Sequence, residues 1–364
     1  MDAVINHAGY ATLADLQQDA VQVVNAPMLP ERWNDWKPSA DENWHSFHQA
    51  IDYQSKNWQQ WWGPDWVRAG LPGYPAPGSS DITMNLAGLP DFRTESPQAV
   101  TPPQWLLNNP GTRVVSKPNY TVADYLIEWQ SDWVRRFGID GFRIDTVKHV
   151  EGEVWQRLKQ RATESLAAWR KDNNQSGEPF WMMGEVWGHG AYRSPYFDDG
   201  FDALINFDIQ KRMNGAACLS QMAMVYRDYA QTLAKYPDFN PVSYMSSHDT
   251  ELFFGRFKSL DMQRNAANAL LLTPGAIQVY YGDEVAREAG PYADDFHQGT
   301  RSDMPWEWNA ERQALLKHWQ TLGQFRQRHP AIGTGEHREI AQSNAYVFTR
   351  TLGEDKVVVA FVGR

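Results

Sequence analysis

The feature that most constrains the fold of this chain is a series of short apolar runs, each of which ends in polar or charged residues. Longer segments with helical periodicity separate most of these runs, and such alternation is typical of parallel β/α units. The apolar runs cover residues 3–5, 139–144, 180–183, 203–207, 242–245 and 277–281. Helices are expected at about 121–137, 151–172, 212–235, 260–272 and 309–328. The pattern predicts an α/β fold.

The position of the polar residues makes this prediction more specific. Asp, Glu, His and Arg residues gather directly after the apolar runs. In a TIM (β/α)8-type barrel the active site forms at the carboxyl ends of the strands, so we predict a barrel of this type. Residues 1–7 and 119–335 would form it. The segment 8–118 is too long for a simple connection and reads as an inserted subdomain, and 336–364 as the start of a β-rich C-terminal domain.

The helix expected over 121–137 illustrates how the sequence sets an element. Trp129, Trp133 and Phe137 share one face at i, i+4 spacing. Gly138 follows as the expected C-cap, because glycine adopts the left-handed conformation that ends many helices. The helix would deliver the chain into the strand at 139–144.

Composition and charge argue against several classes of partner. The net charge is −10 and no run of Lys or Arg stands out, which disfavours a nucleic acid or an anionic membrane surface. No stretch approaches the roughly 20 apolar residues that span a bilayer, and the N-terminus lacks a signal-peptide pattern, so neither localisation nor oligomeric state is predicted. Cys218 is the single cysteine; a disulfide partner in a longer chain is a hypothesis. A neutral ligand suits this composition best.

The first candidate catalytic pair stands at the end of the strand at 139–144. Arg143 precedes Asp145 by two residues, so both side chains point to the same side of the sheet. A guanidinium beside a carboxylate keeps the carboxylate ionised, as a nucleophile must be. A purely structural Arg–Asp pair explains this motif equally well when it is taken alone.

Two further carboxylates follow later strands. Glu185 has apolar neighbours that would raise its pKa, as a general acid requires, although a lone glutamate after a strand is more often a solvated loop residue. Asp249 follows His248 at the end of another strand. Carboxylates at three strand ends of one barrel would meet at one mouth, where like charges are costly unless they are used. Two carboxylates that flank a glycosidic bond are what glycoside hydrolysis requires.

At this point the residues resemble the α-amylase family, glycoside hydrolase family 13. Four strings are similar to the ordered signature regions of that family: Asp2-Ala3-Val4-Ile5-Asn6-His7, Gly141 to His149, Gly184-Glu185-Val186-Trp187 and Ser247-His248-Asp249. Two more strings resemble its domain B and eighth-strand motifs: Leu89-Pro90-Asp91-Phe92 and Tyr280-Tyr281-Gly282-Asp283-Glu284. The likeness runs over almost the whole chain and looks most like bacterial periplasmic members.

The resemblance implies an enzyme that cleaves α-1,4-glucosidic bonds in starch and maltodextrins with retention. It implies that Asp145 is the nucleophile and Glu185 the general acid/base. Asp249 would hold the sugar hydroxyls next to the reacting carbon, and Arg143 would orient Asp145.

The resemblance also implies which residues bind substrate and metal. His7 and His248 would bind sugar hydroxyls where cleavage occurs, and Lys148 and His149 would contact the sugar on the leaving-group side. Calcium would be bound by Asn6, Asp91 and the main-chain carbonyl of His149; an amide, a carboxylate and a carbonyl suit a hard cation. Without the resemblance, Asn6 reads as a strand cap and Asp91 as a turn residue.

One departure and two alternatives stay open. The family's first signature closes its third barrel strand, yet here it begins at residue 2, so we expect a barrel without its first two strands and a chain that is N-terminally truncated. A transglycosylase or isomerase of the same family would use the same carboxylates, and an inactive glucan-binding remnant would not use them. The resemblance implies a periplasmic location for the full-length protein.

Overall fold

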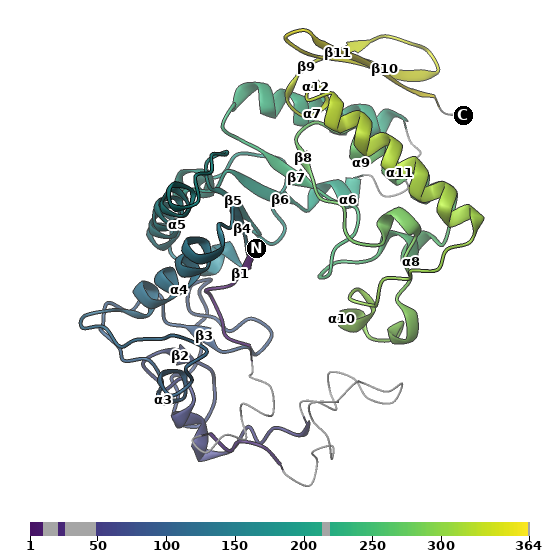
Figure 1. The fold of residues 1–364 in the computed structure, drawn as a ribbon. Helices are drawn as coiled ribbons and strands as arrows, with labels where there is room; N and C mark the ends of the chain where they lie inside the picture. Colours follow the sequence, from purple (N-terminus) through teal and green to yellow (C-terminus); the bar gives the residue numbers. More distant parts are fainter. Residues whose placement is uncertain (10–20, 26–48, 213–218, 363–364) are drawn as a thin grey trace. The chain divides into compact units, whose positions relative to one another are not determined.

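The computed structural model describes residues 1–9, 21–25, 49–212 and 219–362 (Figure 1). The chain divides into two compact units. The first unit comprises residues 1–186 and 198–201, and the second comprises 187–197 and 202–364. Cys218, the start of the helix expected from 212, and much of the expected insertion (10–20 and 26–48) lie outside the described residues.

The first unit is built around three parallel strands in the order β1-β4-β5. Its described elements are β1 (Asp2–Ala3), η3 (Lys56–Gln60), β2 (Val67–Arg68), β3 (Asp91–Phe92), α3 (Gln104–Leu107), α4 (Val122–Phe137), β4 (Gly141–Ile144), η4 (Val147–His149), α5 (Gly152–Asp172) and β5 (Trp181–Gly184). The long helices α4 and α5 pack against each other (Figure 1). The apolar runs at 139–144 and 180–183 therefore form neighbouring strands, as predicted.

Helix α4 begins and ends where its sequence provides caps. Thr121 accepts a hydrogen bond from the backbone N–H of Asp124, and the Asp124 side chain accepts one from the backbone N–H of Thr121, which together make a capping box. Gly138 ends the helix with φ 65°, as predicted. An added Cβ on Gly138 would lie 2.5 Å from the Trp169 ring, so no larger residue fits there without a shift. The turn thereby fixes the entry into β4.

The aromatic face of α4 divides into two parts. The Trp129 ring stacks on Trp66 at a centroid distance of 5.7 Å. Trp133 and Phe137 stack on each other but stay 48 % and 53 % exposed. The shared face predicted for these three residues is therefore packed against this unit only at its N-terminal end.

The segment that leads from η3 to α3 is held by aromatic packing and by one short antiparallel strand pair. β2 and β3 pair antiparallel, with Val67 opposite Phe92 and Arg68 opposite Asp91. The indole of Trp62 makes edge contacts with Phe92 and Trp105. This strand pair lies next to the end of β1, because Asp91 also forms an isolated β-bridge with His7.

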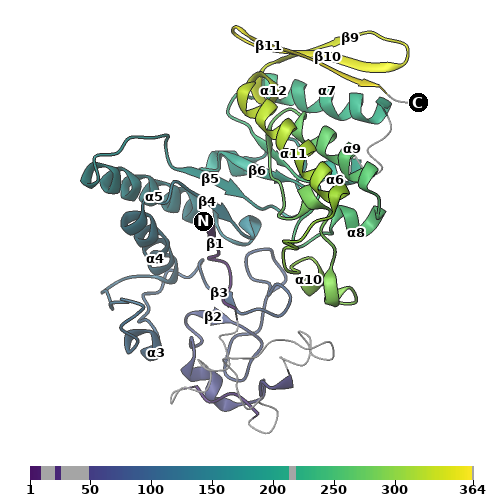
Figure 2. The same cartoon turned by 45° about the vertical axis from the view of Figure 1, so that its right-hand side comes forward.

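The second unit repeats the β/α pattern with three parallel strands in the order β6-β7-β8. Its described elements are β6 (Ala203–Asn206), α6 (Asp208–Arg212), α7 (Leu219–Lys235), β7 (Pro241–Ser243), α8 (Phe253–Phe257), α9 (Leu260–Leu271), β8 (Ala276–Ile277), η6 (Asp283–Val285), η7 (Gly290–Tyr292), α10 (Phe296–Gly299), α11 (Ala310–Arg328), α12 (Ala331–Thr334), β9 (Glu336–Ile340), β10 (Ala345–Leu352) and β11 (Asp355–Val362). Helices α9 and α11 pack side by side (Figure 2). The 3-10 helix η5 (Pro195–Asp199) spans a boundary between the units.

Strand β8 is shorter than its apolar run predicts. Pairing with β7 covers only Ala276 and Ile277, whereas the run extends to Tyr281. Val279 and Tyr281 are exposed, and the chain turns at Gly282 with φ 88°. The apolar residues after Ile277 therefore belong to the loop that follows the strand.

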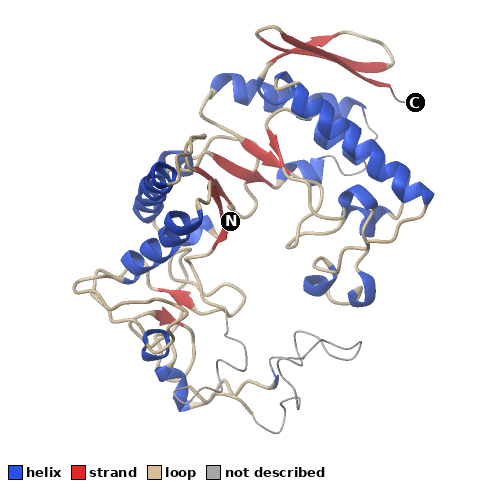
Figure 3. Ribbon diagram, in the orientation of Figure 1, coloured by secondary structure: helices blue, strands red, loops and turns tan. Residues whose placement is uncertain are grey.

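The C-terminal residues form a three-stranded antiparallel sheet in the order β11-β10-β9 (Figure 3). Tyr226 of α7 contacts Phe348 of β10 and Phe361 of β11, and its hydroxyl donates to the carbonyl of Ala269 at 2.7 Å. The sheet thus shares one core with α7 and α9.

The prediction of an α/β fold with parallel strands, helices between them and a C-terminal antiparallel sheet is confirmed. Among the described residues, no helix combines the length and apolar character that crossing a bilayer requires.

Candidate active site

One group of predicted site residues lies in the first unit, where β4 and β5 end. Arg143 lies on β4 and Asp145 directly follows the last residue of that strand, so the two side chains, two residues apart, point to the same side. The next residue, Thr146, adopts a left-handed conformation with φ 53°, which turns the chain directly after the strand. The backbone N–H of Glu185 donates to the carbonyl of Ile144 at 2.8 Å, so the register of the two strands sets Glu185 beside Asp145.

One guanidinium joins the two carboxylates. Nη1 of Arg143 lies 2.7 Å from Oδ1 of Asp145, and Nη2 lies 3.2 Å from Oε1 of Glu185. Nη1 also contacts Asp2 at 3.1 Å. The structure therefore brings Arg143, Asp145 and Glu185 together in the way that the strand positions predict.

The environment of Glu185 favours its protonated form. The residue is 6 % exposed, and burial raises its pKa to about 7. Arg143 opposes this effect, whereas the charge of Asp145 and a hydrogen bond with it reinforce the rise. A carboxylic acid with this pKa can donate a proton near neutral pH and accept it back.

Three predicted substrate residues of the first unit have different partners. Nε2 of His7 lies 4.0 Å from Oδ2 of Asp145, and burial lowers the pKa of His7. Nζ of Lys148 lies 3.7 Å from Oδ1 of Asp81, and Nδ1 of His149 donates to the Asp81 carbonyl at 2.6 Å. Asp81 therefore holds both Lys148 and His149.

The three predicted calcium ligands lie together next to His7. Nδ2 of Asn6 is 2.8 Å from Oδ1 of Asp91 and 3.2 Å from the carbonyl oxygen of His149. The oxygen and nitrogen of an amide are assigned from the hydrogen-bond network, and a 180° turn of the Asn6 amide would set three oxygen atoms face to face. This donor set, an amide, a carboxylate and a carbonyl, fits a hard cation. Among the described residues no group of three or more His, Cys, Asp and Glu side chains could hold a metal ion.

A buried arginine, which the sequence did not reveal, also reaches this cluster. Arg68 forms ion pairs with Oδ2 of Asp91 and with Glu95, and it is 5 % exposed. Its partners are 23 and 27 residues away in the chain. Only the pairing of β2 with β3 brings them together, so no local sequence signal could have identified Arg68.

Another group of predicted residues lies in the second unit, after β7. Oδ2 of Asp249 lies 2.8 Å from Nε2 of His248, and Oδ1 lies 2.9 Å from Nη2 of Arg301. Burial alone would raise the pKa of Asp249, but the hydrogen bonds and charges of His248 and Arg301 lower it to about 2. Asp249 is therefore ionised at neutral pH. That Asp249 meets Asp145 and Glu185 stays a prediction.

A buried carboxyl group supports the loop that carries Asp249. Oγ of Ser246 donates to Oδ1 of Asp283, and the backbone N–H of Phe253 donates to the same Ser246 oxygen at 2.9 Å. Burial raises the pKa of Asp283 to about 7 despite the hydrogen bond from Ser246. Asp283 thus ties the residues before and after Asp249 to the loop after β8.

Arg301 is the contact of Asp249 that sequence reasoning did not assign. Its Nη1 also donates to the carbonyl of His248 at 2.8 Å. Arg301 stands 52 residues after Asp249, in a loop with several charged residues, and nothing in its local sequence distinguishes it as the partner.

Comparison with known proteins places the chain among α-amylases. The model of the family described as "Alpha amylase, catalytic domain" matches residues 115–338. The periplasmic alpha-amylase of Escherichia coli (strain K12) is 45 % identical over 375 aligned positions, which cover 100 % of this chain and 54 % of the relative. The alpha-amylase of Streptomyces lividans is 27 % identical and aligns with 63 % of this chain and 28 % of its own length. This chain thus spans about half, or less, of these relatives.

Solved structures show the same fold. The alpha-amylase of Geobacillus thermoleovorans, complexed with acarbose, matches 99 % of this chain and 64 % of its own chain with a TM-score of 0.61 and 21 % identity. An alpha-amylase from H. orenii matches 84 % of this chain and 64 % of its own with a TM-score of 0.54 and 22 % identity. The matched family model covers more than half of the chain and includes β4, β5 and β7, after which the candidate carboxylates follow. The chain belongs to the alpha-amylase family.

Proposed function

We propose that the protein is a retaining glycoside hydrolase of the α-amylase type that cleaves α-1,4-glucosidic bonds in starch and maltodextrins. The observation that carries this proposal is the arrangement of Asp145 and Glu185 around Arg143, with the pKa of Glu185 raised to about 7. A retaining mechanism uses two carboxyl groups. One is an ionised carboxylate, as Asp145 beside Arg143 would be, and the other is a protonated carboxylic acid, as Glu185 would be.

The two carboxyl groups would act in sequence. Glu185 donates its proton to the glycosidic oxygen while Asp145 attacks the anomeric carbon, so that a covalent glycosyl ester forms and the leaving sugar departs with the proton. Glu185, now ionised, then takes a proton from water as the water oxygen attacks the same carbon and releases Asp145. Arg143 holds the Asp145 carboxylate in place through both steps, because its Nη1 is bonded to Oδ1.

Other residues would position the substrate. Asp249, ionised and held by Arg301, would accept hydrogen bonds from the hydroxyls next to the reacting carbon. His7 and His248 would bind hydroxyls of the same sugar, and Lys148 and His149 those on the leaving-group side. The position of His7, 4.0 Å from Asp145, supports its role.

Calcium is the finer part of this proposal. We infer that Asn6, Asp91 and the carbonyl of His149 hold Ca²⁺. The ion would link the β2–β3 strand pair, the end of β1 and η4. Chelation with EDTA should then lower the melting temperature of the protein, and Ca²⁺ should restore it. In Asp91→Asn, the melting temperature should no longer respond to Ca²⁺; an unchanged response would contradict this ligand set.

The proposal extends to the whole protein in two further respects. We propose a (β/α)8-type barrel from residues 1–7 and 119–335, an inserted domain from 8–118 and a β-rich C-terminal domain that starts at 336. The similarity to the periplasmic alpha-amylase of Escherichia coli supports a periplasmic location for the full-length protein.

The proposed activity is tested by the release of reducing ends from soluble starch in the presence of Ca²⁺. The parent should release sugars, and both Asp145→Asn and Glu185→Gln should not. Products from maltooligosaccharides should be shorter than the substrate; products longer than the substrate would identify a transglycosylase. The proposal is wrong if the parent releases no sugar and also forms no product that is longer than the substrate.

A further inference from the structure

A buried arginine of the second unit has no carboxylate as its partner. Arg287 is 2 % exposed, and none of the ion pairs among the described residues includes it. Its guanidinium carbon lies 3.9 Å from the centroid of the Tyr281 ring. Moving a cation out of water without a counter-charge is costly, so the hydrogen bonds of this guanidinium have to offset that cost.

Those hydrogen bonds hold the main chain on both sides of Arg301. Nη2 of Arg287 donates to the carbonyl of Thr300 at 3.1 Å, and Nη1 donates to the carbonyl of Ser302 at 3.0 Å. Nη1 also donates to Oγ of Ser302 at 2.7 Å, and Nε donates to the carbonyl of Tyr281 at 2.9 Å. Because a guanidinium is planar and its N–H groups diverge at fixed angles, it sets the relative positions of the two carbonyls.

Two tyrosine hydroxyls donate to the same two carbonyls. The hydroxyl of Tyr280 donates to the carbonyl of Thr300, and that of Tyr281 donates to the carbonyl of Ser302, both at 2.9 Å. Burial raises the pKa of Tyr280 to about 12, so its hydroxyl keeps its proton at neutral pH. Each carbonyl beside Arg301 thus accepts two hydrogen bonds from the segment after β8, which uses both lone pairs of its oxygen.

The side chain that extends from this segment contacts Asp249. Nη2 of Arg301 lies 2.9 Å from Oδ1 of Asp249, and Nη1 donates to the carbonyl of His248 at 2.8 Å. Oγ1 of Thr300 donates to the same His248 carbonyl at 2.6 Å. The Arg301 side chain is 45 % exposed, so packing alone does not fix it. Its position depends on the main chain from which it extends.

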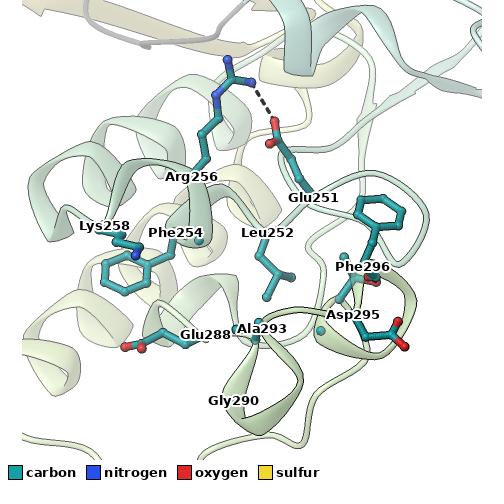
Figure 4. A pocket seen from close by; sticks show the side chains of 14 residues that line it. Glu251, Leu252, Phe254, Arg256, Lys258, Glu288, Gly290, Ala293, Asp295 and Phe296 are labelled. Carbon is teal, nitrogen blue, oxygen red and sulfur yellow. Dashed lines mark hydrogen bonds and ion pairs between the residues drawn. The ribbon is translucent and has the colours of Figure 1, made fainter. Parts of the chain in front are cut away.

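That main chain also borders an open space. Thr300 and Glu288 line a cavity of about 590 Å³ in the second unit (Figure 4). Glu288 directly follows Arg287, and its carbonyl accepts a hydrogen bond from Oγ of Ser302 at 2.6 Å. Atoms beside a cavity have fewer packing neighbours than atoms of a filled core. Hydrogen bonds therefore contribute more to the position of this segment.

We propose that Arg287, assisted by the hydroxyls of Tyr280 and Tyr281, is a positioning residue that sets the guanidinium of Arg301 on Asp249. This inference rests on the proposed function, to which it adds a role for a residue that touches no substrate. The charges that lower the pKa of Asp249 are those of His248 and Arg301. Arg287 therefore acts through the position of Arg301 and not through its own charge.

The test is a double-mutant cycle on kcat/KM for maltoheptaose with Arg287→Met and Arg301→Gln. Methionine keeps a long side chain beside Tyr281 but has no N–H donor. Arg287→Met alone should lower kcat/KM by about three- to tenfold, up to the loss expected for Arg301→Gln. In the Arg301→Gln background the same change should lower kcat/KM by less than about twofold, because the contact that Arg287 positions is already lost.

The acidic limb of the pH–activity profile is a second readout, which a general loss of folded protein does not move. Arg301 lowers the pKa of Asp249, so a displaced Arg301 lets that pKa rise, and the acidic limb of Arg287→Met should move to higher pH. Arg287→Lys keeps a charge but loses the planar set of donors, and it should resemble Arg287→Met. Arg264→Gln changes an exposed arginine of the same unit, paired with Asp261, and should match the parent.

A further variant keeps the packing and covers the case in which Arg287→Met does not fold. The double change Tyr280→Phe and Tyr281→Phe removes both hydroxyls and keeps both rings. It should move the acidic limb in the same direction and lower kcat/KM by about two- to fivefold, because Arg287 still holds the two carbonyls.

Two results would overturn the inference while leaving the proposed function intact. One is an equal loss from Arg287→Met in the parent and in the Arg301→Gln background. The other is an acidic limb that stays in place both in Arg287→Met and in the double tyrosine variant. If the parent cleaves no maltooligosaccharide, the proposed function fails and this inference fails with it.

Discussion

Glu185 in the first unit shares one guanidinium with a second carboxylate, whereas Asp249 in the second unit has an arginine and a histidine of its own. The consequence is visible in their pKa values. Burial and the nearby Asp145 raise that of Glu185 to about 7, against the effect of Arg143. Burial also acts on Asp249, but His248 and Arg301 overcome it and lower its pKa to about 2.

This difference shows how carboxyl side chains of one protein can be suited to different roles. A carboxyl group that titrates near neutral pH can exchange a proton with the substrate, whereas one that stays ionised can only accept hydrogen bonds or stabilise positive charge. The number of cationic neighbours per carboxylate, rather than burial alone, separates the two cases here.

The largest effect is expected from the carboxylates of the first unit. Asp145→Asn removes the attacking oxygen and should lower kcat on maltoheptaose by about 10⁴-fold or more. Glu185→Gln should lower it by about 10² to 10⁴-fold, because a general acid contributes about that much. Asp261→Asn, at a carboxylate whose side chain is 90 % exposed, is the matched control and should retain full activity.

Removal of the shared guanidinium should disturb both carboxylates of the first unit. Arg143→Gln should lower kcat/KM by about 10² to 10³-fold, since a partly buried charge-assisted contact to each carboxylate is lost. Because Arg143 lowers the pKa of Glu185, the alkaline limb of the pH–activity profile should move to higher pH. An alkaline limb that stays in place would show that another group sets it.

The contributions of Glu185 and Asp249 to the pH dependence of stability should have opposite signs. The folded pKa of Glu185, about 7, lies above its usual value of 4.5, so its contribution to stability is present below pH 4.5 and is lost as the pH rises through about 7. Urea unfolding should therefore show that Glu185→Gln gains stability relative to the parent between pH 4 and pH 8, by on the order of 3 kcal/mol. A difference that is flat with pH would contradict the raised pKa.

For Asp249 the sign is reversed. Its folded pKa of about 2 lies below the usual 3.8, so its contribution is present above pH 3.8 and is lost as the pH falls through about 2. In the same unfolding assay, Asp249→Asn should be less stable than the parent at pH 6, and the gap should close as the pH approaches 2. A gap that widens in acid would reverse the assignment.

The smallest effect is expected at Arg301. Arg301→Gln removes one of the two partners of Asp249 but leaves His248 in place, and it should lower kcat/KM by about tenfold at neutral pH. The acidic limb of the pH–activity profile should move to higher pH, while the alkaline limb should stay at the same pH. Comparison with Arg143→Gln then asks directly whether each arginine acts only on the carboxylate that it contacts.

The sequence predicted those features of the fold that depend on neighbouring residues. Apolar runs located β4 and β5 within a few residues, and Gly138 marked the end of α4 because the requirement for a left-handed residue is local. Strand β9 was not predicted as a strand, because its residues, Glu336 to Ile340, are mostly exposed and polar and carry no apolar run. Its pairing with β10 decides its conformation.

The same distinction separates what was predicted at the candidate site from what was missed. Asp145 directly follows the strand that carries Arg143, and the two residues are two positions apart, so their contact follows from strand geometry. Arg68 and Arg301 contact carboxylates that are 23 and 52 residues away, and only the fold brings them there. The resemblance to a family indicated the carboxylates and Arg143, but it did not indicate Arg68 or Arg301.

The central claim is that Asp145 forms the covalent bond while Glu185 moves the proton. The most direct measurement is mass spectrometry of the protein after reaction with 5-fluoro-α-glucosyl fluoride, whose fluorine slows hydrolysis of the ester. The account predicts a glycosyl adduct that maps to Asp145 in a peptide covering residues 141–149, and no adduct in Asp145→Asn. An adduct on Glu185 or Asp249, or turnover of this reagent by the parent without any adduct, would contradict it.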